Sequence, residues 1–235
     1  MFRIRERKGF IQLTGEVGSG KTALCRALFE TLGSGYATAL ILNPRLSESQ
    51  LLRAILKEFA VPGISRDPLD NYERLNAWLL AQVRERRDAV LVIDEAQDLT
   101  LATLEQVRLL SNLETDSQKL IQIVLMGQPE LRHLIDMPSL RQLRQRITVR
   151  YHLGCLDCVE TDSYLRHRMS VAGGRGVPTF KPAAVRRIWR YSRGTPRLLN
   201  ALADKALLAG FVHRTDRISV GLAKLAEREL EGRCS

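Results

Sequence analysis

The sequence predicts an α/β body built on a mainly parallel sheet, followed by a small all-helical domain. Short apolar runs alternate with amphipathic helical stretches over residues 1–154, which is typical of βαβ units. Over residues 155–235 only the helical period continues. The length of 235 residues allows one or two domains, at roughly 100–200 residues each. A content of 45% hydrophobic and 26% charged residues is the ordinary balance of a globular protein.

The chain opens with an apolar strand expected over residues 10–14, which meets Gly15. A helix over about 21–32 follows, and Gly33 closes it. The next β-like run covers 36–42. A strand, a glycine and a helix in immediate succession predict the first βα unit of a parallel sheet.

The remaining elements follow from apolar spacing. Ser47 is a suitable N-cap for a helix over 47–59, and a second amphipathic helix covers 70–87. Continuous apolar runs indicate strands buried on both faces. Those strands are expected over 89–93, 120–126 and 147–151, with a helix over 100–113 between the first two. The helices of the second domain are expected over about 158–172, 181–192, 196–210 and 217–230.

Composition excludes several classes of protein. No apolar run approaches the roughly 18–20 residues that a membrane span needs, and the charged start of the chain is unlike a secretory signal. Four cysteines are too few for a secreted disulfide scaffold, so we expect a cytoplasmic protein. The pair Cys155 and Cys158 lacks the second pair that structural zinc needs, and it lacks a thioredoxin-like context at a helix N-terminus. We therefore expect no metal or redox role for it.

The positive charge lies in the second half of the chain. Residues 1–117 carry 15 basic and 16 acidic side chains, whereas residues 118–235 carry 21 basic and 10 acidic ones. This asymmetry suggests a surface for phosphate, nucleic acid or an acidic partner. Solvated helix faces combined with a coding bias toward arginine would produce the same pattern.

A phosphate-binding loop follows the first strand. It reads Gly15-Glu16-Val17-Gly18-Ser19-Gly20-Lys21-Thr22, with Ala23 next in the helix. The backbone N–H groups of such a loop cradle phosphate oxygens, and the helix directs its positive dipole end at the anion. Lys21 would bridge the β- and γ-phosphates, and Thr22 would hold Mg²⁺. The alternative is a plain glycine-rich turn.

Two carboxylates end the most buried of the expected strands. Asp94 and Glu95 follow the run over 89–93 and so lie at the sheet edge where open α/β proteins bind ligands. Asp94 would orient Mg²⁺, and Glu95 would polarise the attacking water as general base. The alternative is a strand end with acidic residues before the next helix.

These motifs, together with further strings, resemble a known family. The strings are GFIQLTGEVGSGKT, VIDEAQDL, LLSNLET, MGQPEL, LRQLRQRI and SRGTPRLLN. Over almost the whole chain the sequence is similar to the ExeA-type AAA+ ATPases of the general secretion pathway protein A group, whose relatives include pilus-biogenesis and exosortase-associated ATPases. The resemblance implies an AAA+ αβα P-loop NTPase body with a helical lid, which uses ATP with Mg²⁺. It also implies a further segment before the first strand that helps to enclose the adenine.

The same resemblance implies roles for four more residues. Gln128 resembles sensor 1, which helps to place the lytic water, although it could be a turn residue before a proline. Arg197 resembles the sensor 2 arginine, although it could be a surface residue at a helix start. Arg144 and Arg146 resemble the arginine-finger segment, and the position of Arg146 before the last strand favours it. A solvated basic strip is the alternative for both.

The leading hypothesis for function is an oligomeric ATPase that drives or regulates assembly of an envelope secretion or pilus apparatus. A finger acts on ATP bound to a neighbour, so activity would need a homo-oligomer. The protein would be cytoplasmic, and its partners could hold it at the inner membrane. Two alternatives stay open: a DNA-linked switch that resembles transposition ATPases, and a nucleotide-dependent scaffold that does not hydrolyse ATP.

Overall fold

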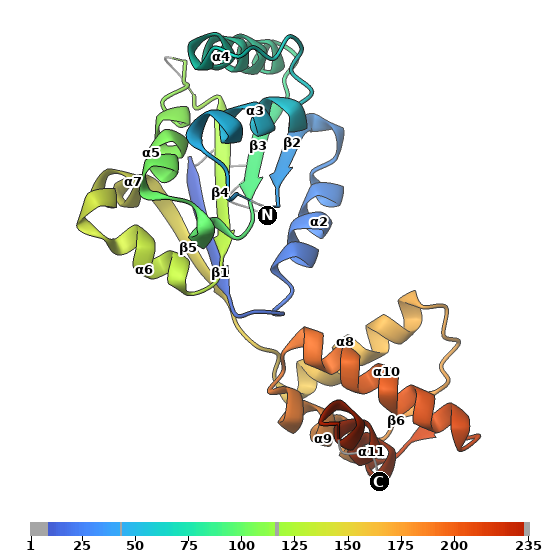
Figure 1. The fold of residues 1–235 in the computed structure, drawn as a ribbon. Helices are drawn as coiled ribbons and strands as arrows, with labels where there is room; N and C mark the ends of the chain where they lie inside the picture. The colour runs from blue at the N-terminus through green and yellow to red at the C-terminus, as the bar shows by residue number, and fades with distance from the viewer. Residues whose placement is uncertain (1–8, 43, 116–117, 233–235) are drawn as a thin grey trace. The chain divides into compact units, whose positions relative to one another are not determined.

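The computed structural model describes residues 9–42, 44–115 and 118–232. These residues divide into two compact units, drawn in Figure 1. The first unit comprises residues 9–16 and 21–153, and the second comprises residues 17–20 and 154–232. Within the described ranges, no helix is both long enough and apolar enough to cross a membrane.

A five-stranded parallel sheet forms the centre of the first unit. Its strands are β1 (Phe10–Gly15), β2 (Tyr36–Ile41), β3 (Asp88–Ile93), β4 (Ile121–Gly127) and β5 (Ile147–Leu153), in the spatial order β2-β3-β4-β1-β5. All neighbouring strands are parallel. Their carboxyl ends therefore meet at one edge of the sheet, and ligands of open α/β folds bind at that edge.

Helices cover both faces of this sheet, as Figure 1 shows. The helix α2 (Lys21–Leu32) packs on the face that carries Val90, Val92, Val124 and Met126. The opposite face carries the larger core, to which several helices contribute. These are α3 (Glu48–Glu58), α4 (Pro68–Arg84), α5 (Leu101–Leu110), α6 (Glu130–Asp136) and α7 (Arg141–Arg146). The expected three-layer αβα body is confirmed.

Element boundaries differ from the sequence expectation where local caps decide them. The helix α4 begins earlier than expected because the Asp67 side chain accepts a hydrogen bond from the N–H of Leu69 and Pro68 occupies the first turn. The helix α3 starts as expected, since Ser47 and Gln50 form a reciprocal capping box. The helices α6 and α7 were not predicted, because seven and six residues are too few for a clear helical period.

Leu91 offers a direct test of the core, because its side chain on β3 is fully buried. We expect Leu91→Ala to lower the free energy of unfolding by about 2–5 kcal/mol, since the truncation removes buried methyl groups and leaves a cavity. Chemical denaturation measures this change. The matched control is Leu69→Ala, whose leucine is 65% exposed and whose effect should stay within about 0.5 kcal/mol. Equal effects at the two positions would contradict the described core.

Cys25 on α2 predicts a difference in thiol reactivity. Burial raises the pKa of the Cys25 thiol to about 11, and the nearby Asp94 charge adds to the shift. Cys155 is an exposed free thiol. At pH 8 we therefore expect iodoacetamide to alkylate Cys155 well before Cys25, because the thiolate is the reactive form. Peptide mass spectrometry over time measures both rates, and in urea the two should converge. Equal rates in the native protein would contradict the buried position of Cys25.

The second unit is helical. Its helices are α8 (Cys158–Val171), α9 (Pro182–Ser192), α10 (Pro196–Val212) and α11 (Val220–Leu230). They enclose a separate core that includes Leu165, Ile188, Leu199 and Ala226. One ion pair supports this core from its rim: the Arg187 guanidinium donates to both oxygens of the Glu227 carboxylate, which is almost fully buried.

Two local features of this unit differ from the sequence expectation. A two-residue parallel ladder joins β6 (Thr179–Phe180) to β7 (Arg217–Ile218), so the unit is not entirely helical. Cys158 is the first residue of α8, so this cysteine of the pair lies at a helix N-terminus, whereas Cys155 precedes the helix. Among the residues that the structure describes, no group of three or more His, Cys, Asp or Glu side chains could hold a metal ion.

Candidate nucleotide site

The loop between β1 and α2 has the backbone of a phosphate cradle. Gly18 and Gly20 have φ angles of +79° and +94°, which side chains with a Cβ rarely adopt. The helix α2 begins at Lys21, directly after this loop, so its first unpaired N–H groups lie at the loop's end. The hydroxyl of Ser19 is buried and has no partner among the described residues. An anion bound in the loop would supply the missing acceptor.

Lys21 is a buried cation held by backbone carbonyls. Its side chain is only 6% exposed. The Nζ atom donates to the carbonyl oxygens of Gly15 at 2.7 Å and Glu16 at 3.1 Å. An ammonium group has three donors, so one remains for a ligand. A buried ammonium without an anionic partner is costly, which favours the binding of a negatively charged group beside it.

Thr22 and Asp94 meet at the edge where the strands end. The Thr22 hydroxyl donates to Asp94 Oδ2 at 2.7 Å, and the Glu95 N–H donates to the other oxygen, Oδ1, at 2.9 Å. Asp94 is 3% exposed. A threonine hydroxyl and a carboxylate are hard oxygen ligands, which Mg²⁺ prefers. The pair therefore has the donor chemistry for a magnesium ion.

Glu95 is held in an unusual conformation by two amide side chains. Its φ angle is +51°, in the left-handed region that a residue with a Cβ enters at a cost. Its Oε2 atom accepts from Gln97 Nε2 at 2.6 Å and from Gln128 Nε2 at 3.3 Å. The backbone N–H of Gln128 in turn donates to Gln97 Oε1 at 3.0 Å. The acidic residue and the residue expected as sensor 1 are thus joined in one network.

Comparison with known proteins agrees with this geometry. A family model described as an AAA domain matches residues 4–135. The chain belongs to the AAA domain family. This AAA domain protein is also 44% identical over 232 residues to General secretion pathway protein A of Aeromonas hydrophila. That match covers 98% of the chain and 42% of the relative, so the chain spans less than half of the relative's length. The resemblance expected from the sequence is confirmed.

Solved structures share the fold of this AAA domain protein. The ORC2 protein of Aeropyrum pernix, solved as ADPNP–ADP complexes, superposes with a TM-score of 0.70 at 17% identity. The superposition covers 100% of this chain and 65% of ORC2. Drosophila ORC bound to DNA gives a TM-score of 0.70 at 18% identity over 96% of this chain and 56% of that one. At such identities the likeness shows the fold alone.

The arginines expected to act as fingers lie on α7 of the first unit and bond within their own chain. Arg146 is half-buried, and its Nη1 atom donates to the hydroxyl of the buried Ser111 at 2.6 Å. Arg144 is exposed and makes one long contact, 3.5 Å, to the carbonyl oxygen of Asp136. The Lys119 ammonium holds the pKa of the Glu114 carboxyl below its usual range, and the Arg146 charge adds to this effect. Neither arginine contacts Asp94 or Glu95.

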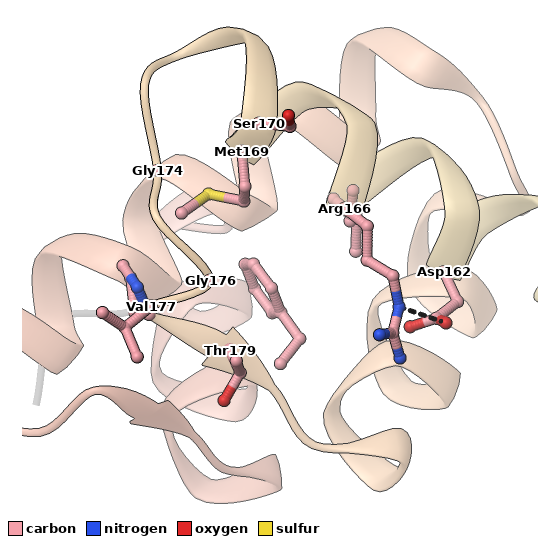
Figure 2. A pocket seen from close by; sticks show the side chains of 11 residues that line it. Asp162, Arg166, Met169, Ser170, Gly174, Gly176, Val177 and Thr179 are labelled. Carbon is pink, nitrogen blue, oxygen red and sulfur yellow. Dashed lines mark hydrogen bonds and ion pairs between the residues drawn. The ribbon is translucent and has the colours of Figure 1, made fainter.

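Arg197 belongs to the second unit, where it is an exposed residue in the first turn of α10. The same unit has a pocket of about 360 Å³ that none of the expected site residues line (Figure 2). It lies between residues 162–170 of α8 and the segment 174–180. Its wall combines apolar side chains such as Met169 and Phe180 with the ion pair that Arg166 and Asp162 form at 2.8 Å.

Sequence reasoning missed two polar residues that contact the expected site residues. Gln97 follows Glu95 by two positions. Ser111 is the first residue after α5 and lies within the string LLSNLET. The available signal for Gln97 was an amide side chain in a short turn beside the acidic pair. No local signal could have identified Ser111, because its partner Arg146 lies 35 residues further along the chain.

Proposed function

We propose that this AAA domain protein binds ATP with Mg²⁺ and hydrolyses the bond to its γ-phosphate. The observation that carries the proposal is the hydrogen bond of 2.7 Å between Thr22 and Asp94, because it joins the phosphate loop to the acidic strand end. Mg²⁺, when bound, would neutralise phosphate charge at this point. Thr22 and Asp94 would hold the ion through their hydroxyl and carboxylate oxygens.

Other residues of the chain would bind the phosphates, accept the proton and place the attacking water. Lys21 and the loop N–H groups would bind the β- and γ-phosphates and stabilise the charge that develops on the γ-phosphate oxygens. Glu95 would accept a proton from the attacking water through its carboxylate, acting as general base. Gln128 would help to place that water. Arg197 of the second unit is proposed as sensor 2, and Arg144 or Arg146 as the finger that acts on a neighbouring subunit.

Phosphate release as a function of protein concentration tests this proposal. With ATP and Mg²⁺, we expect hydrolysis whose rate per subunit increases with protein concentration, because a finger from a second copy is needed. Chelation of Mg²⁺ with EDTA should stop it. Sedimentation velocity on the same samples reports the homo-oligomer. ATP binding and assembly without phosphate release would contradict hydrolysis and favour the nucleotide-dependent scaffold.

We further propose that hydrolysis serves the assembly of an envelope secretion or pilus apparatus, with the protein in the cytoplasm and held at the inner membrane by its partners. The support is the similarity to General secretion pathway protein A. Affinity capture of the tagged protein from its host before and after crosslinking identifies the partners. Recovery of secretion or pilus components only with the ATP-bound form would support the proposal, and their absence in both forms would refute it.

An arginine-rich surface at α9 favours a second candidate function, a switch that binds DNA. Arg186 and Arg190 are exposed one helical turn apart on α9, and the exposed Arg193 directly follows the last residue of this helix. Among the described residues, no acidic side chain pairs with any of the three. Arginine suits phosphate recognition, so duplex DNA should bind with strong salt dependence and should stimulate hydrolysis if this candidate is correct. Titration of fluorescent duplex DNA at low salt measures this, and no binding would eliminate the candidate.

A further inference from the structure

We propose that Gln97 is the positioning residue that holds Glu95 as the general base and couples it to Gln128. This inference rests on the proposed hydrolysis of ATP. It assigns a role to a side chain that neither the phosphate loop nor the acidic pair includes.

The two partners of Gln97 fix the orientation of its amide. One partner, the carboxylate of Glu95, can only accept a hydrogen bond when ionised, and the other, the backbone N–H of Gln128, can only donate one. Only one orientation satisfies both: Nε2 toward Glu95 at 2.6 Å and Oε1 toward the Gln128 nitrogen at 3.0 Å. The side chain therefore bridges the turn after β3 to the end of β4.

The two carboxylate oxygens of Glu95 differ in their hydrogen bonding. Gln97 and Gln128 both donate to Oε2, at 2.6 Å and 3.3 Å. Within the part of the chain that the structure describes, no donor contacts the other oxygen, Oε1. Oε1 therefore keeps its lone pairs for the proton of the attacking water. The amide of Gln97 has the shorter of the two bonds and thus fixes which oxygen is free.

Packing and backbone geometry explain why Glu95 needs the two hydrogen bonds from Gln97 and Gln128. Glu95 has a φ angle of +51°, and a residue in this sparsely populated region keeps that conformation only when its surroundings fix it. Gln97 fills the space beside Gly127 so closely that a Cβ at Gly127 would overlap its Oε1 atom. The missing side chain of Gly127 thus gives Gln97 room to reach both partners.

Two variants of Gln97 test the inference. Gln97→Met keeps the length of the side chain but removes both hydrogen bonds, whereas Gln97→Glu keeps an acceptor for Gln128 and loses the donor to Glu95. We expect kcat to fall by about 10- to 100-fold in each, because a base displaced by about 1 Å loses rate on this scale. The dissociation constant for ATP should change by less than about twofold, since Gln97 contacts no residue that we assign to phosphate binding.

The matched control is Gln106→Met on α5, a residue whose amide oxygen is buried without a partner among the described residues. Its kcat should equal that of the wild type. Thermal unfolding of each variant checks that the fold is intact. Wild-type kcat in either Gln97 variant, or an increase, would overturn the inference. Loss of ATP binding together with a fall in kcat would also overturn the inference, because Gln97 would then support the whole fold.

Refutation of ATP hydrolysis and refutation of the role of Gln97 would give different experimental results. If the wild type binds ATP but releases no phosphate under any condition that produces the oligomer, hydrolysis itself is refuted. If the wild type hydrolyses ATP, Glu95→Gln is inactive and both Gln97 variants match the wild type, only the role of Gln97 is refuted. Phosphate release and fluorescent-nucleotide binding on the same set of five proteins separate these results.

Discussion

Replacing Glu95 with glutamine is expected to lower kcat for ATP hydrolysis by about 10²–10⁴-fold, which is the usual contribution of a positioned general base. Glutamine has nearly the same shape, so the loop and Lys21 should still bind ATP. It cannot accept a proton at neutral pH. Phosphate release gives kcat, and equilibrium binding of a fluorescent ATP analogue gives the dissociation constant. Stopped hydrolysis with intact binding is the expected signature.

The control for this prediction is Glu130→Gln, an exposed glutamate at the start of α6, two residues after Gln128. The same substitution there should leave both constants unchanged. Equal hydrolysis in Glu95→Gln and the wild type would remove Glu95 from the role of base. Loss of ATP binding in Glu95→Gln would mean that the carboxylate supports the loop rather than the attacking water.

The phosphate loop, the acidic pair and the strands that carry them could be predicted because they are local. The run over 89–93 is apolar at every position, and β3 has this buried character in the structure. Lys21 follows its loop glycines immediately, so spacing alone places it at the start of α2. Elements of this kind depend on neighbours within a few residues, and the sequence records those neighbours directly.

The contacts that distant segments make could not be predicted in the same way. Gln97 bonds to Gln128 across 31 positions, and Arg146 bonds to Ser111 across 35. Polar side chains at such separations carry no period or spacing that indicates a partner. The ladder of β6 and β7 is also absent from the pattern, because two residues per strand show no alternation.

Removal of the arginine finger is expected to have the largest effect on hydrolysis, about 10³–10⁵-fold in kcat. The position of Arg146 before β5 favoured it in the sequence, but the contacts shift the preference to Arg144. Arg146 is bonded to the buried Ser111, so reaching a neighbour would break a short hydrogen bond. Arg144 is exposed and would give up only a contact of 3.5 Å. We therefore expect Arg144→Ala to be the more severe variant.

Mixing two inactive variants shows whether the finger acts on a neighbour. An Arg144→Ala subunit keeps its own base, and a Glu95→Gln subunit keeps its own finger. In a head-to-tail oligomer, the second can supply the finger to the first, so an equal mixture should recover about a quarter of the wild-type rate. The same mixture with Arg146→Ala tests the other candidate. If only the mixture of Arg146→Ala with Glu95→Gln recovers activity, the finger is Arg146. No recovery with either variant would mean that both arginines act within their own subunit, because only an effect on a neighbour can be supplied by a different chain.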